Sequence, residues 1–120
     1  MKLFAGNLAY LHFYLSNFTD EPSLENALRN IPYCHENTNI TGGLRLARTE
    51  IFNVANGDRP DVPNGIILIS DGFPTLEINE LYSEVALIKS LGVRIVGVGV
   101  TYEVSELRPF FYVYSSISIT

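Results

Sequence analysis

The sequence predicts an α/β fold in which helices cover a mostly parallel β-sheet. Two short apolar runs support this prediction, residues 66–70 and residues 93–100, both rich in β-branched residues. Runs that are largely apolar and too short for a helix are typical of strands buried on both faces, which occur in parallel sheets. Helical periodicity precedes each run, and this alternation of helix and strand implies right-handed crossovers between parallel strands.

The first half of the chain contributes one expected strand and two expected helices. Residues 8–16 are dense in leucine and aromatic residues and are expected to form a strand. Pro22 suits the first turn of the following short helix. Its apolar residues recur at helical spacing: Leu24, Ala27, Leu28 and Ile31. A longer helix is expected over residues 42–56, with Thr41 as its cap and Gly57 at its end.

The second half alternates strand, helix and strand. Residues 66–70 form the first buried strand, and a helix over residues 79–91 should follow and stop at Gly92. This helix should direct four apolar residues inward: Leu81, Val85, Ile88 and Leu91. Residues 93–100 then form the second buried strand, whereas the apolar, β-prone tail over residues 101–120 fits the alternation poorly.

Composition limits the classes of function. The 120 residues, 47% of them hydrophobic, suffice for one core and one domain. A net charge of −5, with the eight Lys and Arg scattered singly, argues against nucleic acid binding. No apolar stretch reaches the roughly 20 residues of a membrane helix, and the first residues are too soon polar for a signal peptide. The single cysteine, Cys34, excludes an internal disulfide.

The candidate binding residues lie where the first buried strand ends. Asp71 follows that strand directly, and ligands of parallel sheets sit beyond the carboxyl ends of the strands. A hydroxyl-rich loop containing Thr38 precedes the helix over residues 42–56. Carboxylate and hydroxyl oxygens suit a hard cation such as Mg²⁺, but two ligands alone make a weak site. Asp71-Gly72 also suits a simple turn, which leaves a purely structural role for Asp71 open.

Five motifs in colinear order resemble the von Willebrand factor type A (vWA) domain. They are NTNITGGL (37–44), ARTEIF (47–52), NGDRPDVP (56–63), ILISDG (67–72) and GVRIVGVG (92–99). The resemblance extends over about residues 8–100, and the connection GDRPDVP is similar to that of the extracellular-matrix branch found in matrilins and non-fibrillar collagens. Integrin I domains are less similar.

This resemblance implies a doubly wound sheet and a non-enzymatic adhesion module that binds extracellular-matrix proteins such as collagens. Such domains hold a divalent cation, commonly Mg²⁺, at a metal-ion-dependent adhesion site. Its ligands come from an Asp-x-Ser-x-Ser turn, a Thr and an Asp, of which the last two carry over to Thr38 and Asp71. The Asp-x-Ser-x-Ser turn is missing from the sequence. The metal site is therefore expected to be incomplete, with Mg²⁺ weakly bound or absent.

The missing motif also implies an incomplete fold. The first, central strand and the closing helix of the family are expected to be absent, so residues 1–120 would be one partial domain with a poorly matched tail at 101–120. The parent protein is expected to be extracellular or on the cell surface, with no signal peptide in this chain and no membrane insertion.

Two N-glycosylation sequons and two alternative functions complete the expectations. The sequons begin at Asn17 and Asn39, and a glycan on Asn39 would crowd the edge near Thr38, which favours an unmodified Asn39.

One alternative function is that of a metal-independent interaction fragment or a non-functional truncated product. The other is a phosphoryl-transfer enzyme using Asp71, although the chain offers no phosphate-binding glycine loop.

Overall fold

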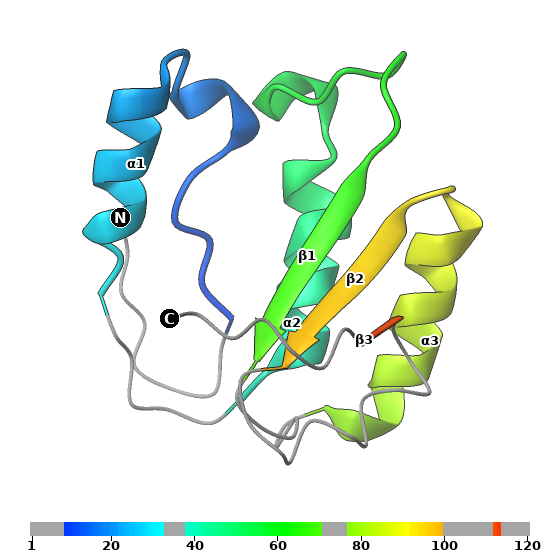
Figure 1. The fold of residues 1–120 in the computed structure, drawn as a ribbon. Helices are drawn as coiled ribbons and strands as arrows, with labels where there is room; N and C mark the ends of the chain where they lie inside the picture. The colour runs from blue at the N-terminus through cyan, green and yellow to red at the C-terminus, as the bar shows by residue number, and fades with distance from the viewer. Residues whose placement is uncertain (1–8, 33–37, 71–76, 100–111, 114–120) are drawn as a thin grey trace.

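The computed structural model describes residues 9–32, 38–70, 77–99 and 112–113 (Figure 1). Within these ranges the chain forms, in order, η1 (Leu15–Asn17), α1 (Glu21–Arg29), α2 (Ile40–Leu46), η2 (Ala47–Ile51), η3 (Val54–Asn56), β1 (Gly65–Ser70), α3 (Ile78–Ser90), β2 (Arg94–Gly99) and β3 (Tyr112–Val113). The elements η1 and η3 are 3₁₀ turns, and η2 is a π-helical turn.

The described strands form one parallel sheet in the order β1-β2-β3. The register pairs Gly65 with Arg94 and Ser70 with Gly99, so β1 and β2 are aligned along their full length. Both α2 and α3 lie behind this sheet in Figure 1, which places them on one face. The parallel α/β arrangement predicted from the two apolar runs is confirmed.

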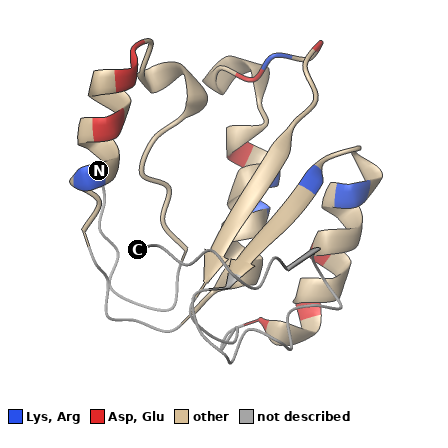
Figure 2. Ribbon diagram, viewed as in Figure 1, with Lys and Arg blue, Asp and Glu red and all other residues tan. Residues whose placement is uncertain are grey.

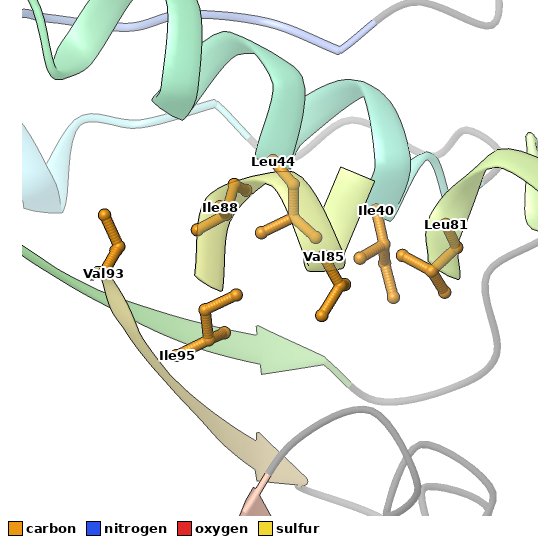
Figure 3. Packing of buried hydrophobic residues seen from close by; sticks show 7 residues of the cluster. All are labelled: Ile40, Leu44, Leu81, Val85, Ile88, Val93 and Ile95. Carbon is orange, nitrogen blue, oxygen red and sulfur yellow. The ribbon is translucent and has the colours of Figure 1, made fainter. Parts of the chain in front are cut away.

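A small apolar core lies between the two helices and the sheet (Figure 3). Its seven buried members are Ile40, Leu44, Leu81, Val85, Ile88, Val93 and Ile95. Phe52, Ile66 and Leu68 pack against this cluster. Three of the four residues expected to point inward from α3 belong to the core. The fourth, Leu91, is 63% exposed, because it lies just beyond the helix end at Ser90.

The face of β1 opposite the core is open within the described residues. Side chains alternate between the two faces of a strand, so Ile66 and Leu68 face the helices while Ile67 and Ile69 face away. Ile67 is 73% exposed and Ile69 is 68% exposed. The expectation that this strand is buried on both faces is therefore wrong for the described part of the chain, because α2 and α3 cover one face only.

The N-terminal strand expected over residues 8–16 is not found among the described residues. Residues 9–14 have no regular structure, and Leu15–Asn17 form the turn η1. Aromatic content favoured a strand, but a strand also needs a paired neighbour, and no described strand pairs here. The rings of Phe13 and Phe18 instead pack edge to face, with centroids 5.2 Å apart.

The short helix α1 forms where it was expected, with Asp20 as its cap. The Oδ1 atom of Asp20 accepts a hydrogen bond from the backbone N–H of Ser23 at 2.9 Å. Pro22 lies in the first turn, where its missing N–H leaves no bond unmade. None of the residues of α1 is fully buried, although Ala27 is half-buried and lines a pocket shared with Phe13 and Phe18.

The helix expected over residues 42–56 is broken into α2, η2 and η3. It starts earlier, because Asn39 rather than Thr41 is the N-cap, with its Oδ1 accepting the N–H of Gly42 at 2.7 Å. It widens into the π-helical turn η2, which closes with a hydrogen bond from Phe52 N to Ala47 O at 3.0 Å. The side chain of Asn53 then caps η3 by accepting from Ala55 N. Gly57 ends η3 in the left-handed region, as the sequence predicted.

Candidate functional site at the carboxyl edge of the sheet

A groove of about 320 Å³ runs between α2 and β1 and reaches the carboxyl end of β1. Thr38 and Asn39 line it from the start of α2, and Ser70 lines it from the last position of β1. Its floor and walls are largely apolar side chains of the same two elements. The loop before α2 and the end of the first buried strand therefore meet at one edge, as parallel topology predicts.

Of the two predicted metal ligands, the structure describes one. Thr38 is half-buried and lines the groove beside the N-cap of α2. Asp71 lies outside the described residues, although its chain neighbour Ser70 lines the same groove. The prediction that Thr38 and Asp71 form a pair of ligands therefore stays a prediction.

The described polar groups that line the groove do not suffice to bind a divalent cation. They are the hydroxyls of Thr38 and Ser70 and the amide of Asn39, all uncharged. Mg²⁺ requires near-octahedral oxygen coordination and usually at least one carboxylate. Within the described ranges, no three His, Cys, Asp or Glu side chains gather closely enough to hold a metal ion. The oxygen chemistry suits a hard cation, but the number and charge of these donors do not.

Glu77 connects the start of α2 to the start of α3 beside this edge. Its backbone has a left-handed φ of 50°, an unfavourable conformation for a residue with a side chain. The hydroxyl of Thr41, which is fully buried, donates a hydrogen bond to the carbonyl oxygen of Glu77 at 2.8 Å. Arg45 Nη1 donates to Glu77 Oε2 at 3.0 Å. These two contacts hold Glu77 in its strained conformation.

A buried acid joins the same two helices one turn further along. Glu84 is only 5% exposed, and both of its oxygens accept hydrogen bonds from Arg48, at 2.5 Å and 3.2 Å. Arg45 Nε lies 3.8 Å from Glu84 Oε2. Because Arg48 donates these hydrogen bonds to the carboxylate of Glu84, the pKa of the Arg48 guanidinium is raised above its ordinary value.

Sequence reasoning missed this ion-pair cluster, although a signal was available. Glu84 falls among the inward positions Leu81, Val85 and Ile88 of the predicted helix. An acid within a buried stripe requires a cationic partner. The partner could not be chosen from the sequence, because Arg45 and Arg48 lie 39 and 36 positions away in the chain (84 − 45 and 84 − 48).

The two sequons lie in different environments. Asn17, the last residue of η1, is exposed, and its Oδ1 accepts a hydrogen bond from the backbone N–H of Tyr14 at 2.6 Å. Asn39 is half-buried and caps α2.

The sequence matches the family model of the von Willebrand factor type A domain over residues 2–108. The chain belongs to this family. The resemblance inferred from the five motifs is therefore confirmed, and the vWA match includes the groove between α2 and β1.

Relatives of this vWA chain include human vitrin and human cochlin. The chain is 29% identical to vitrin over 75 residues, which are 62% of the chain and 11% of vitrin. It is 29% identical to cochlin over 70 residues, which are 58% of the chain and 13% of cochlin. The chain thus spans about a tenth of the length of the curated relatives that it matches.

Solved structures of proximal thread matrix protein 1 from the mussel byssus share the fold. One matches with a TM-score of 0.74 and 24% identity, covering 85% of this chain and 28% of that chain. A second, described as having a zinc-occupied MIDAS motif, matches with a TM-score of 0.67 and 28% identity, covering 78% of this chain and 22% of that chain. The similarity confirms the vWA fold and shows that a related domain holds a divalent metal.

Among the described residues, none of the helices is both long enough and apolar enough to cross a bilayer.

Proposed function

We propose that this vWA chain is a non-enzymatic protein-recognition module of an extracellular-matrix or cell-surface protein. The observation that carries the proposal is the groove at the carboxyl edge of the sheet, where Thr38, Asn39 and Ser70 meet. Membership of the vWA family and the fold shared with a byssal thread matrix protein support it. The partners that we propose are extracellular-matrix proteins such as collagens.

The chemistry of the edge suggests how such a partner would bind. Hydroxyl and amide groups around an apolar groove can hydrogen-bond the backbone or side chains of a partner while the groove buries an apolar residue. A cation would contribute only if Asp71 and the partner supplied the missing carboxylate oxygens. We therefore propose that Mg²⁺ binding to the chain alone is weak or absent.

Surface plasmon resonance on immobilised fibrillar and network collagens tests the proposal. The full chain is titrated over a concentration series in millimolar Mg²⁺ and in excess EDTA, so that each Kd is fitted from a saturation curve. Thr38→Ala and Asp71→Ala should each weaken binding at least tenfold, about 1.4 kcal/mol. Thr49→Ala and Asp61→Ala remove the same chemical groups at exposed positions outside the groove and should leave binding unchanged.

Two results would contradict this proposal. One is an equal loss of binding in the groove variants and their controls, which would indicate a general effect on folding or charge. The other is undiminished binding in a Thr38→Ala, Asp71→Ala double variant. Calorimetric titration of the same double variant with Mg²⁺ tests metal binding separately from partner binding. Heat of binding that persists in this variant would mean that Mg²⁺ binds at another site.

The open side of β1 favours a second candidate, metal-independent recognition of an extended apolar segment. Within the described strands β1 pairs only with β2, and its outer face presents Ile67 and Ile69. An extended peptide could add to this edge by backbone hydrogen bonds. Ile67 and Ile69 also line the groove, so the deciding variants are those at its polar end. Binding that is unchanged in Thr38→Ala and Asp71→Ala, and is lost in an Ile67→Thr, Ile69→Thr double variant, would select this candidate over the first.

A further inference from the structure

The two sequons, Asn17-Phe18-Thr19 and Asn39-Ile40-Thr41, differ in whether the folded domain can carry a glycan on them. An N-linked glycan is attached to the Nδ2 atom of the asparagine, and it is bulky and hydrophilic, so it requires a site at the surface. We propose that the mature protein is glycosylated at Asn17 and not at Asn39, an inference that rests on the extracellular location proposed above.

The surroundings of Asn17 leave room for a glycan. Asn17 and Thr19 are both exposed. Phe18 between them has an extended backbone, with φ −130° and ψ 135°. The Oδ1 atom of Asn17 holds the turn by accepting from Tyr14 N, and this bond does not involve Nδ2. A sugar on Nδ2 therefore leaves the turn that presents it intact.

The surroundings of Asn39 do not leave such room. Its side chain lies over the first turn of α2, where a Cβ atom built on Gly42 would be 2.8 Å from Asn39 Nδ2. The amide of Asn39 therefore packs directly against the helix backbone at Gly42, and the residue is half-buried. The sequon threonine, Thr41, is fully buried and donates its hydroxyl to Glu77 O. The folded chain thus holds both the asparagine and the threonine of this sequon against α2 and α3, whereas both are exposed in the first sequon.

The position of Asn17 also keeps a glycan away from the proposed recognition edge. Leu15 of η1 shares a pocket with Gly65, the first residue of β1. Ser16 packs so closely on Gly57 that a Cβ there would be 2.6 Å from Ser16 N. This places η1 at the amino end of β1, whereas Ser70 ends β1 roughly 17 Å away, at about 3.3 Å per residue. The glycan would shield the end that carries the exposed Leu15 and leave the groove accessible.

Secretion of the full chain from mammalian cells behind an added leader peptide tests the inference. Intact mass and gel mobility are measured before and after digestion with peptide N-glycosidase F, and the modified asparagine is mapped by mass spectrometry of peptides. We expect a single mobility shift, from one glycan at Asn17. Thr19→Ala should abolish the shift, and Thr19→Ser, which restores the sequon, should keep it.

Asn39→Asp is the matched variant for the second sequon. Aspartate caps a helix as well as asparagine does, so this change removes the sequon and preserves the cap of α2. The mass shift of this variant on digestion should equal that of the wild-type chain.

A wild-type chain whose mass does not change on digestion would overturn the proposal, and so would mapping of the glycan to Asn39. If little chain is secreted, an unmodified Asn17 in the pool retained by the cells would overturn it equally. Collagen binding is measured separately on the Thr19→Ala chain. A failure of glycosylation is thereby distinguished from a failure of the proposed recognition function.

Discussion

At the scale of single residues, the carboxylate of Glu84 is the most strongly constrained charged group that the structure describes. It is buried between α2 and α3 and accepts two hydrogen bonds from Arg48. Taking a carboxylate out of water costs several kcal/mol, on the order of the stability of a whole domain, unless cations and donors replace the solvent. Arg48 and Arg45 replace the lost solvent with hydrogen bonds and positive charge. Without them, Glu84 could not be buried between α2 and α3 at an acceptable cost in free energy.

Arg48→Ala should therefore lower the free energy of unfolding by about 3 kcal/mol, near the lower end of the range for breaking a buried ion pair. The matched control is Arg29→Ala, which removes an exposed i, i+4 pair with Glu25 and should cost at most about 0.5 kcal/mol. Urea unfolding followed by circular dichroism measures both. Equal effects of the two substitutions would contradict the structural role assigned to Glu84.

Two glycines with positive φ should respond differently to alanine. Gly57 has φ 100°, and a Cβ there would meet Ser16 at 2.6 Å, so Gly57→Ala combines backbone strain with a collision. We expect a loss of about 2–3 kcal/mol. Gly92 has φ 79° with nothing within 4 Å of its Cβ position, so Gly92→Ala should cost only about 1 kcal/mol of backbone strain. Thermal unfolding of the two variants checks this order, and the reverse order would contradict it.

At the scale of elements, helix α1 depends on its cap, because none of its residues is buried. The N–H of Ser23 stabilises the ionised form of Asp20 and lowers the pKa of that carboxyl below its ordinary value of 3.8. Since the folded pKa lies below the unfolded one, this contribution to helix stability is fully present above about pH 4. It is lost as the pH falls through the folded pKa.

We therefore expect α1 to fray in acid before the core opens. Amide hydrogen exchange measured by NMR should show the protection of Ser23 and its neighbours in α1 falling below about pH 4, while α3 stays protected. In an Asp20→Asn variant, which keeps a neutral cap, the protection of α1 should not change with pH over this range. An acid-induced loss that persists in Asp20→Asn would assign the effect to another carboxyl group.

At the scale of the whole molecule, the sheet is covered by helices on one side, and within the described residues the other side is open at β1. Helices α2 and α3 and the core lie on one face (Figures 1 and 3). Ile67 and Ile69 of β1 are exposed and, by the alternation of side chains along a strand, lie on the other face. The strand carries no charged side chain along its length (Figure 2). Charged residues and prolines protect exposed sheet edges from pairing with other chains, and β1 has neither.

The double substitution Ile67→Thr, Ile69→Thr should consequently reduce self-association. Threonine keeps the β-branched shape that suits a strand, and it removes the apolar surface that faces water. Sedimentation velocity at increasing concentration should show oligomers for the unmodified chain and a monomer for the variant, with little change in unfolding free energy. The matched substitution Ile66→Thr, on the core side of the same strand, should instead destabilise the fold. Unchanged association in the double variant would show that β1 is not the contact.

Much of the fold could be predicted from local patterns. The helix over Ile78–Ser90, the strands over Gly65–Ser70 and Arg94–Gly99, and their parallel arrangement all follow from periodicity and from the alternation of elements. The break of the second helix at η2 was not predictable, because the residues around Ala47 and Ile51 continue a helical pattern. The prediction of an N-terminal strand was wrong for the described residues 9–16, because aromatic content indicates strand propensity but does not supply a pairing partner.

The sequence by itself determined the class of this protein, its vWA family and the loop and strand that border the candidate site, since these depend on the order and spacing of residues along the chain. Only the tertiary structure decided that Asn39 caps α2, that Glu84 is buried against Arg48, and that one face of β1 is open. Each of these depends on which distant segments meet in space. Burial and hydrogen bonding are set by those long-range contacts, whereas periodicity records only the preference of each segment.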